Sequence, residues 1–248
     1  MVPIKTPVEI EILRKAGRIL SLVLKEVSSS VKAGMRTADI DLLTEELIRK
    51  NGCIAAFKGY RGYPASACVS VNQEVVHGIP GDRIIKTGDI VSIDAGLIYQ
   101  NYYADAALTV TIDPVDPAVK KLVDVTREAL NKGIAQAKAG VHLSNISHAI
   151  QIYAEAHECS VVRDFVGHGI GRQLHEEPEI LNYGPANCGP VLQEGMVFCI
   201  EPMLNMGDWQ TKILDDGWTV ETLDGKPSAH FEHMILIQKG AAEVLTKF

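Results

Sequence analysis

The chain has 248 residues and a formal net charge of −7, with 46% hydrophobic and 22% charged residues, which is ordinary for a soluble globular protein. The acidic balance and the absence of long Lys/Arg runs exclude the basic face of a nucleic-acid-binding protein. No apolar stretch reaches the ~18 residues that a membrane span requires. The length is sufficient for a large core in one domain or in two small ones.

Apolar residues at three- and four-residue steps predict helices, and shorter apolar runs predict strands. In chain order these are two helices (9–31 and 38–52), three strands (66–72, 89–99 and 107–112), two further helices (118–138 and 145–158) and three further strands (196–204, 217–223 and 231–238). Asp116 followed by Pro117 marks the start of the third helix. Thr37 and Ser144 are the expected N-caps of the second and fourth helices.

This order of elements is repeated, and so are parts of the sequence. KAGMRTADI (32–40) and KAGVHLSNI (138–146) share Lys, Ala, Gly and Ile at matching positions, 106 residues apart. The segments GDIVSID (88–94) and GMVFCIE (195–201) lie 107 residues apart, and each runs from a glycine through an apolar strand to an acid. We therefore expect one catalytic domain, 1–248, made of duplicated halves at about 1–114 and 115–248.

Two acids of the first half, Asp94 and Asp105, lie on adjacent predicted strands. A hairpin loop centred between Tyr99 and Gln100 would place them opposite each other, and a loop centred one residue further along would make them diagonal neighbours. Either register puts both carboxylates on one face of the sheet. Like charges repel there unless a cation lies between them, so the pair predicts a divalent metal ion. The alternative is one acid in the core and one at an exposed edge.

The second half has the same feature, because Glu201 ends one predicted strand and Glu232 lies within another. Alternation places Glu232 on the opposite face from Phe231 and His233, and the sequence leaves open which of the two faces is the core.

Three of the eight histidines, His77, His168 and His175, lie in glycine-punctuated segments together with these four acids. Six residues separate His168 from His175, which excludes a helical HExxH zinc site. Carboxylate-rich ligation with a histidine suits paired first-row divalent ions. Such pairs polarise a carbonyl or phosphoryl oxygen and generate a nucleophile near neutral pH, so the residues predict metal-assisted hydrolysis. A symmetric scaffold without chemistry is the alternative.

Five ordered motifs resemble those of type I methionine aminopeptidases: HGIP (77–80), the Asp94/Asp105 pair, GHGIGRQLHEEP (167–178), CIEP (199–202) and HFEH (230–233). The resemblance covers nearly the whole chain. It implies the α+β pita-bread fold, in which duplicated αα-ββ halves are related by a pseudo-twofold axis and helices cover a curved, mainly antiparallel sheet. It also implies removal of the N-terminal methionine from nascent proteins and peptides when the second residue is small.

By the same resemblance, two divalent metal ions (Co, Mn, Fe or Zn) would be held by five ligands: Asp94, Asp105, His168, Glu201 and Glu232. Asp94 would chelate one ion, His168 would bind the other, and Asp105 with Glu232 would bridge them. Glu201 would also act as the general base. A monovalent-cation site near Asn72 and Ser228 is implied as well.

The resemblance also assigns catalytic and substrate-binding roles to His77 and His175, one positioning the scissile amide and the other stabilising the oxyanion. The methionine pocket would be formed by Tyr60, Tyr63, Cys68 and Trp218. Five positions depart from the family pattern: Phe57 and Leu174 beside the pocket, Ala106 and Ala107 where hydroxyl residues often occur, and His230 where Gln is frequent.

The partners expected are nascent polypeptide N-termini and the ribosome, with no nucleic acid and no membrane, and the chain is expected to be a monomer. An odd number of cysteines without a CxxC motif, and no signal-peptide pattern, favour a reducing, cytoplasmic setting. Two other functions stay open. One is a proline-specific peptidase on the same fold, and the other is a non-catalytic pita-bread binding module or scaffold.

Overall fold

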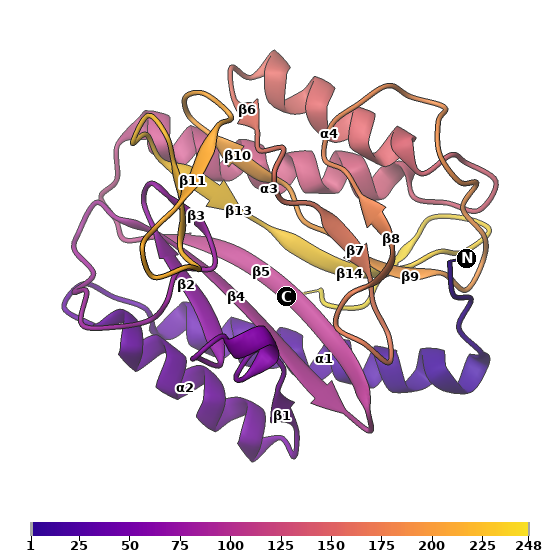
Figure 1. The fold of residues 1–248 in the computed structure, drawn as a ribbon, viewed down its shortest axis with the longest axis horizontal. Coiled ribbons are helices and arrows are strands. Elements are labelled where there is room, and N and C mark those ends of the chain that lie inside the picture. The colour runs from indigo at the N-terminus through magenta and orange to yellow at the C-terminus, as the bar shows by residue number, and fades with distance from the viewer. Residues whose placement is uncertain (1, 248) are drawn as a thin grey trace.

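The computed structural model describes residues 2–247, which form an α+β fold around one curved sheet (Figure 1). Nine strands make up this sheet in the order β1-β4-β5-β14-β9-β7-β8, with β2 also paired to β4 and β15 to β14, and every pair is antiparallel. Two small three-stranded sheets, β13-β10-β6 and β11-β12-β3, lie beside it. This is the fold class that the sequence predicts.

Four α-helices and one 3-10 helix accompany the sheets: α1 (Pro7–Ser30), α2 (Thr37–Lys50), η1 (Tyr60–Gly62), α3 (Pro117–Gln136) and α4 (Ser144–Ala156). Each α-helix lies within a few residues of its predicted bounds. Asp116 caps α3 as predicted, accepting a hydrogen bond from the backbone N of Ala118. Within residues 2–247, no helix is both long and apolar enough to cross a membrane.

The N-cap predictions for α2 and α4 are wrong, because Thr37 and Ser144 are the first residues of these helices rather than their caps. Their hydroxyls bond to neighbouring loops instead. Thr37 Oγ1 accepts from the backbone N of Gly81 at 2.8 Å, and Ser144 Oγ accepts from the backbone N of Cys188 at 2.7 Å. Both hydroxyls are therefore bonded to residues far away in the sequence and do not cap the helices in the way that local sequence rules had predicted.

The strands of the first half are β1 (Ile54–Ala55), β2 (Ala67–Val71), β3 (Glu74–Val76), β4 (Ile90–Tyr99) and β5 (Tyr102–Thr111). Those of the second half are β6 (Ser160–Val161), β7 (Gly167–Gly169), β8 (Glu176–Ile180), β9 (Val197–Ile200), β10 (Met203–Asn205), β11 (Thr211–Ile213), β12 (Val220–Thr222), β13 (Ser228–His230), β14 (Glu232–Leu236) and β15 (Glu243–Val244). The single strand predicted over 196–204 is divided into β9 and β10, and Glu201 and Pro202 lie between them.

The hairpin of β4 and β5 sets the register on which the acids depend. Its turn is Gln100 and Asn101, with φ of 48° and 64°, as in the turns that favour two-residue hairpins. The loop is thus centred one residue beyond the midpoint of Tyr99 and Gln100, so the second of the two predicted registers is correct. Asp94 pairs with Ala107 and Gly96 pairs with Asp105. Asp94 and Asp105 are therefore diagonal neighbours on one face.

The duplication is visible at the centre of the sheet, where the β4-β5 pair of one half meets the β14-β9 pair of the other. The join is the β5-β14 pairing, in which Glu232 lies opposite Ala107. Asp94 lies on one outer strand of this group of four, β4, and Glu201 directly follows the other, β9. Because the halves meet along their acid-bearing strands, the acids of both halves gather at one place.

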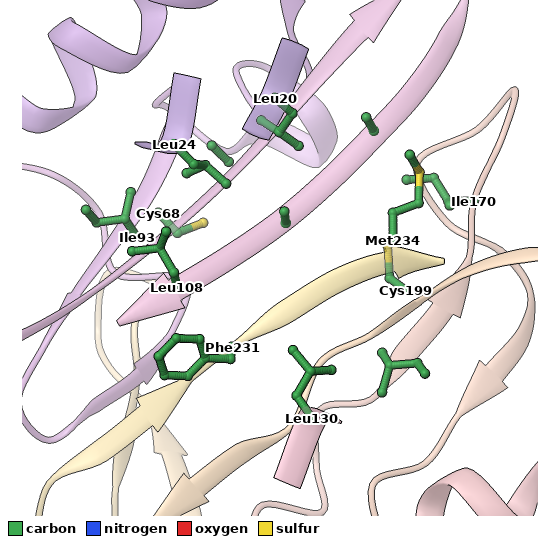
Figure 2. Close-up of a cluster of buried hydrophobic side chains, with 14 of the residues drawn as sticks. Leu20, Leu24, Cys68, Ile93, Leu108, Leu130, Ile170, Cys199, Phe231 and Met234 are labelled. Carbon is green, nitrogen blue, oxygen red and sulfur yellow. The ribbon is translucent and has the colours of Figure 1, made fainter. Parts of the chain in front are cut away.

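Helices cover the face of these strands that points away from the acids (Figure 1). Leu20 and Leu24 of α1 are fully buried beside Ile93 of β4 and Leu108 of β5, and Leu130 of α3 lies near Phe231 in the other half (Figure 2). Successive strand residues point to opposite faces, so Ile93 and Leu108 face the helices while Asp94 and Ala107 face away from them. The acids are thus anchored by strands whose other face is tightly packed.

We predict that Gly17→Ala destabilises the protein, although alanine favours a helix by about 1 kcal/mol over glycine. A Cβ at Gly17 would lie 2.4 Å from the backbone carbonyl O of Leu245, which cannot move without shifting the chain. Overpacking of this kind typically costs about 1–3 kcal/mol, so thermal unfolding followed by circular dichroism should shift down by several degrees.

Gly133→Ala in α3 is the matched control. The nearest atoms to its Cβ would be side-chain atoms of Ile150 and Ile146, at 2.8 Å and 3.3 Å, so relief requires movement of side chains rather than of the backbone and should cost less. The expected order of melting temperatures is wild type, then Gly133→Ala close to it, then Gly17→Ala. An unchanged or higher melting temperature for Gly17→Ala would contradict the close approach.

Candidate active site and metal centre

Three acids lie on neighbouring strands with an alanine between them. Asp94, Ala107 and Glu232 are paired in a row across β4, β5 and β14, and Asp105 lies two residues before Ala107 on the same face. The side chain of Ala107 ends at Cβ, so the space between Asp94 and Glu232 stays open. Oxygens of Asp94, Asp105 and Glu232 lie within 4.8 Å of one another.

Glu201 and His168 complete the group from the second half. The last residue of β9, Ile200, pairs with His233, and this places the next residue, Glu201, beside Glu232. His168 comes from β7, on the other side of β9. Its Nε2 lies 3.5 Å from Glu201 Oε1 and 3.8 Å from Asp105 Oδ2.

The ring of His168 presents a lone pair to these acids. Its Nδ1 lies 3.0 Å from the carbonyl O of Gly169, and since a carbonyl only accepts, Nδ1 carries the proton. Burial, with a smaller contribution from His175, lowers the pKa of His168 to about 3. The imidazole is therefore neutral, its contacts with Asp105 and Glu201 are not ion pairs, and Nε2 is oriented as a metal ligand.

Burial likewise disfavours the charged form of all four acids. It raises the pKa of Asp94 to about 7. The pKa values of Asp105, Glu201 and Glu232 are raised well above the usual range, first by burial and then by repulsion from neighbouring carboxylates. One oxygen each of Asp94, Asp105 and Glu232 has no hydrogen-bond partner among the described residues. Unpartnered buried carboxylate oxygens beside an imidazole lone pair fit divalent cations.

These groups line a cavity. All the catalytic, metal-ligating and substrate-binding residues predicted from the sequence line it: Tyr60, Tyr63, Cys68, His77, Asp94, Asp105, His168, His175, Glu201, Trp218 and Glu232. The fold therefore brings the whole predicted set together, from segments more than 150 residues apart. Phe57 and Leu174, the two pocket positions that depart from the family pattern, line the same cavity.

Two neutral histidines lie in the cavity with the acids. Nδ1 of His175 is 2.8 Å from the hydroxyl of Tyr60, and its ring centroid is 4.3 Å from that of His168. Burial, with the charge of Arg61 contributing, lowers the pKa of His175. Burial, followed by the effect of His175, lowers the pKa of His77 to about 4. Neutral imidazoles can donate through one nitrogen and accept through the other, which suits contact with a peptide group.

One wall of the cavity is aromatic and firmly held. The hydroxyl of Tyr63 donates to the carbonyl of Gly78 at 3.0 Å, and its ring meets that of Trp218 edge-on at 5.1 Å. Cys68 is buried and pairs with Asp94 in the β2-β4 ladder. An apolar wall thus begins directly beside the acids, as a pocket for an uncharged side chain requires.

Some cavity residues were not found from the sequence: Arg61, Val76, Phe165 and Val166. The ring of Phe165 packs edge-on against that of His77 at 5.5 Å. It lies three residues before His168 in DFVGHG, and a single aromatic there carries no periodic signal. Sequence reasoning also passed over Cys199, whose Sγ lies within 4.8 Å of ligand atoms of His168 and Glu232.

The departures at Ala107 and His230 both concern the acids. Ala107 leaves space between Asp94 and Glu232. His230 is buried, with Nε2 3.9 Å from Glu201 Oε2 and no hydrogen-bond partner within the described part of the chain. It therefore adds a buried imidazole beside Glu201.

The cavity combines buried carboxylates and an imidazole with neutral histidines and an apolar wall. This combination is that of a metal-dependent hydrolase. The model of metallopeptidase family M24 matches residues 11–239. The chain belongs to this family.

Named relatives agree with the family. Methionine aminopeptidase 1 of Bacillus subtilis is 51% identical over 247 residues, covering 100% of both chains. The structure of methionine aminopeptidase from Thermotoga maritima superposes with a TM-score of 0.98 at 48% identity, also with 100% of both chains covered. Prolidase from Pyrococcus furiosus superposes with a TM-score of 0.80 at 25% identity, covering 99% of this chain and 65% of that one.

We predict that chelator-stripped protein is stabilised by Mn²⁺ or Co²⁺ and that Asp105→Asn removes most of the effect. A ligand that binds only the folded state at 100 times its Kd stabilises by about 2.7 kcal/mol, which a melting curve resolves easily. Asp124→Asn, a surface change on α3, is the matched control and should respond like wild type. Equal stabilisation and equal metal content for Asp105→Asn would exclude Asp105 as a ligand.

Proposed function

We propose that the chain is a metal-dependent aminopeptidase that removes the N-terminal methionine from nascent polypeptides when the second residue is small. The observation that carries this proposal is the junction, inside one cavity, of the buried acids and His168 with the apolar wall of Tyr63 and Trp218. The relatives named methionine aminopeptidase, at 51% and 48% identity over their full length, support the same substrate.

In this proposal the acids and His168 hold two divalent metal ions, chosen from Co, Mn, Fe and Zn. When bound, such ions polarise the scissile carbonyl and lower the pKa of a water molecule. Glu201 is the general base. Its carboxylate lines the cavity beside His168 and Glu232, where it can accept a proton from the attacking water and return it to the leaving nitrogen.

His77 and His175 contact the substrate. The hydroxyl of Tyr60 occupies Nδ1 of His175, so Nε2 is the nitrogen directed to the peptide, where it can donate to the oxygen that becomes negatively charged. His77, kept neutral by burial, positions the scissile amide. The methionine side chain enters the pocket of Tyr60, Tyr63, Cys68 and Trp218, with Phe57 and Leu174 completing its shape. A thioether suits this soft apolar lining.

A proline-specific peptidase is less well supported, because the prolidase similarity is 25% and this chain spans 65% of that one. A non-catalytic binding module is disfavoured by the complete set of ligands with both histidines.

We also propose a cytoplasmic monomer that acts on polypeptides emerging from the ribosome and holds a monovalent cation near Asn72 and Ser228. The five cysteines form no disulfide within residues 2–247, which is consistent with this proposal.

The test of the activity is release of free methionine from Met-Ala-Ser and Met-Leu-Ser peptides by stripped enzyme reloaded with Mn²⁺ or Co²⁺. We expect metal-dependent cleavage of the first and not of the second. Glu201→Gln should lower kcat by about 10²–10⁴, the usual contribution of a general base. Metal content is measured in parallel, to separate loss of the base from loss of a ligand. Cleavage of neither peptide by metal-loaded enzyme would overturn the proposal.

A second prediction concerns the pocket. Because an apolar pocket discriminates one methylene-sized change by only about 1–3 kcal/mol, norleucine-Ala-Ser should be cleaved at a rate within about 10- to 200-fold of Met-Ala-Ser. Competition kinetics with both peptides measure the ratio of the two kcat/KM values. Complete exclusion of norleucine would require a directed polar contact to sulfur, which the apolar lining does not offer.

A further inference from the structure

A buried lysine remains that the proposed mechanism does not use. Lys5, in the segment before α1, is 7% exposed, and its Nζ contacts the Glu176 carboxylate at the start of β8. The Glu176 side chain is 12% exposed. Lysine is rarely buried unless it is paired, and breaking such a pair leaves an uncompensated charge in the interior. This ion pair joins residues 171 positions apart.

The acid of this pair organises the loop between β7 and β8, residues 170–175. Oε1 of Glu176 accepts from the backbone N of Arg172 at 2.8 Å and from that of Gln173 at 3.2 Å. Gly171 packs directly on the pair, because a Cβ there would lie 2.2 Å from Lys5 Nζ and 2.8 Å from Glu176 Oε1. The loop is thus folded around the two charged groups.

Lys5 itself is fixed to the sheet, beside which the N-terminal segment runs in Figure 1. Its backbone N donates to the carbonyl O of Gly195 at 2.9 Å, just before the strand that leads to Glu201. The next residue, Thr6, caps α1 through a hydrogen bond with Glu9. The ammonium group therefore has a fixed origin from which it can hold the loop.

A second set of contacts holds the loop from the start of β5. Glu9 Oε1 accepts from the Tyr102 hydroxyl at 2.8 Å and from Arg172 Nε at 3.3 Å, and the Arg172 guanidinium lies over the Tyr102 ring. The backbone N of Tyr103 donates to the carbonyl of Gly171 at 2.8 Å. These contacts fix the early part of the loop, and the ion pair of Lys5 with Glu176 holds its later part, together with the contact between Tyr60 and His175.

That later part carries Leu174 and His175, both of which line the cavity. His175 directly precedes Glu176, so movement of the Glu176 carboxylate moves the imidazole. We propose that Lys5 is a positioning residue: its buried ion pair with Glu176 sets the place of His175 against the metal centre. This inference rests on the proposed function, since it assigns Lys5 a role in placing a substrate-contacting group that it does not touch.

Kinetics of Lys5→Met, which keeps the length of the side chain and removes its charge, give the first test. We expect kcat on Met-Ala-Ser to fall about 10-fold with KM within twofold, because misplacement by less than 1 Å costs less than the 10²-fold of a full ångström. Lys5→Arg should recover part of the loss. Lys132→Met removes the lysine of an exposed ion pair on α3 and should match wild type.

A cycle with His175→Ala separates positioning from general destabilisation. If Lys5 acts through His175, then Lys5→Met lowers kcat further by less than twofold when His175 is already alanine, since coupled residues are not additive. A full additional 10-fold loss in that background, or no loss in the single variant, would overturn the proposal.

Hydrogen exchange of the loop amides gives a readout that needs no activity. Lys5→Met should speed exchange at Arg172 and Gln173, whose N–H groups donate to Glu176, while exchange in β4 and β5 stays as in wild type. This arm also separates the two proposals. Faster loop exchange in a protein that cleaves no methionine peptide would overturn the activity and keep the ion-pair role, and unchanged exchange would overturn the role of Lys5.

Discussion

The burial of four carboxylates on one face of a sheet, without a lysine or arginine among the cavity-lining groups that face them, is the constraint on which the rest of the structure depends. Arg61 lines the cavity, but its guanidinium lies over the Tyr60 ring. Burial raises the pKa of each acid, so the charged form of the group is disfavoured unless cations lie beside it. The fold supplies what such a group needs, with packed helices behind the strands, a small residue at Ala107 and an imidazole lone pair from His168.

The duplicated architecture explains how one cavity receives acids from both halves. Each half contributes a pair of acid-bearing strands, and the halves join along β5 and β14, so the pairs become neighbours. The groups that differ between the halves surround this symmetric centre. His175 and Leu174 come from the loop after β7, Tyr60 and Tyr63 from the segment around η1, and Trp218 from the turn before β12. Symmetry places the acids, and asymmetric loops form the pocket.

The N-terminal segment supports one of these asymmetric loops. Lys5 and Glu9 contact the loop that carries His175 from outside the cavity, while Tyr60 holds the same imidazole from inside it. A loop without regular structure is thereby held by side-chain contacts on both of its sides. Preorganisation of this kind is required of groups that contact a transition state, because a misplaced donor stabilises it less.

The sequence by itself determined the elements that rest on local patterns. Apolar periodicity predicted the four α-helices of residues 2–247 within a few residues, and the matching glycine-led strands predicted the duplication. The motifs and the family resemblance together named eleven site residues, and all of them line the cavity. Only the tertiary structure decided the register of the β4-β5 hairpin, because two turn positions were compatible with the same alternation and one residue separates opposite from diagonal acids. It alone decided the helix caps at Thr37 and Ser144, the place of Phe165 and the partner of Lys5. Each of these depends on contacts between residues far apart in the chain, which leave no periodic or local signal in the sequence.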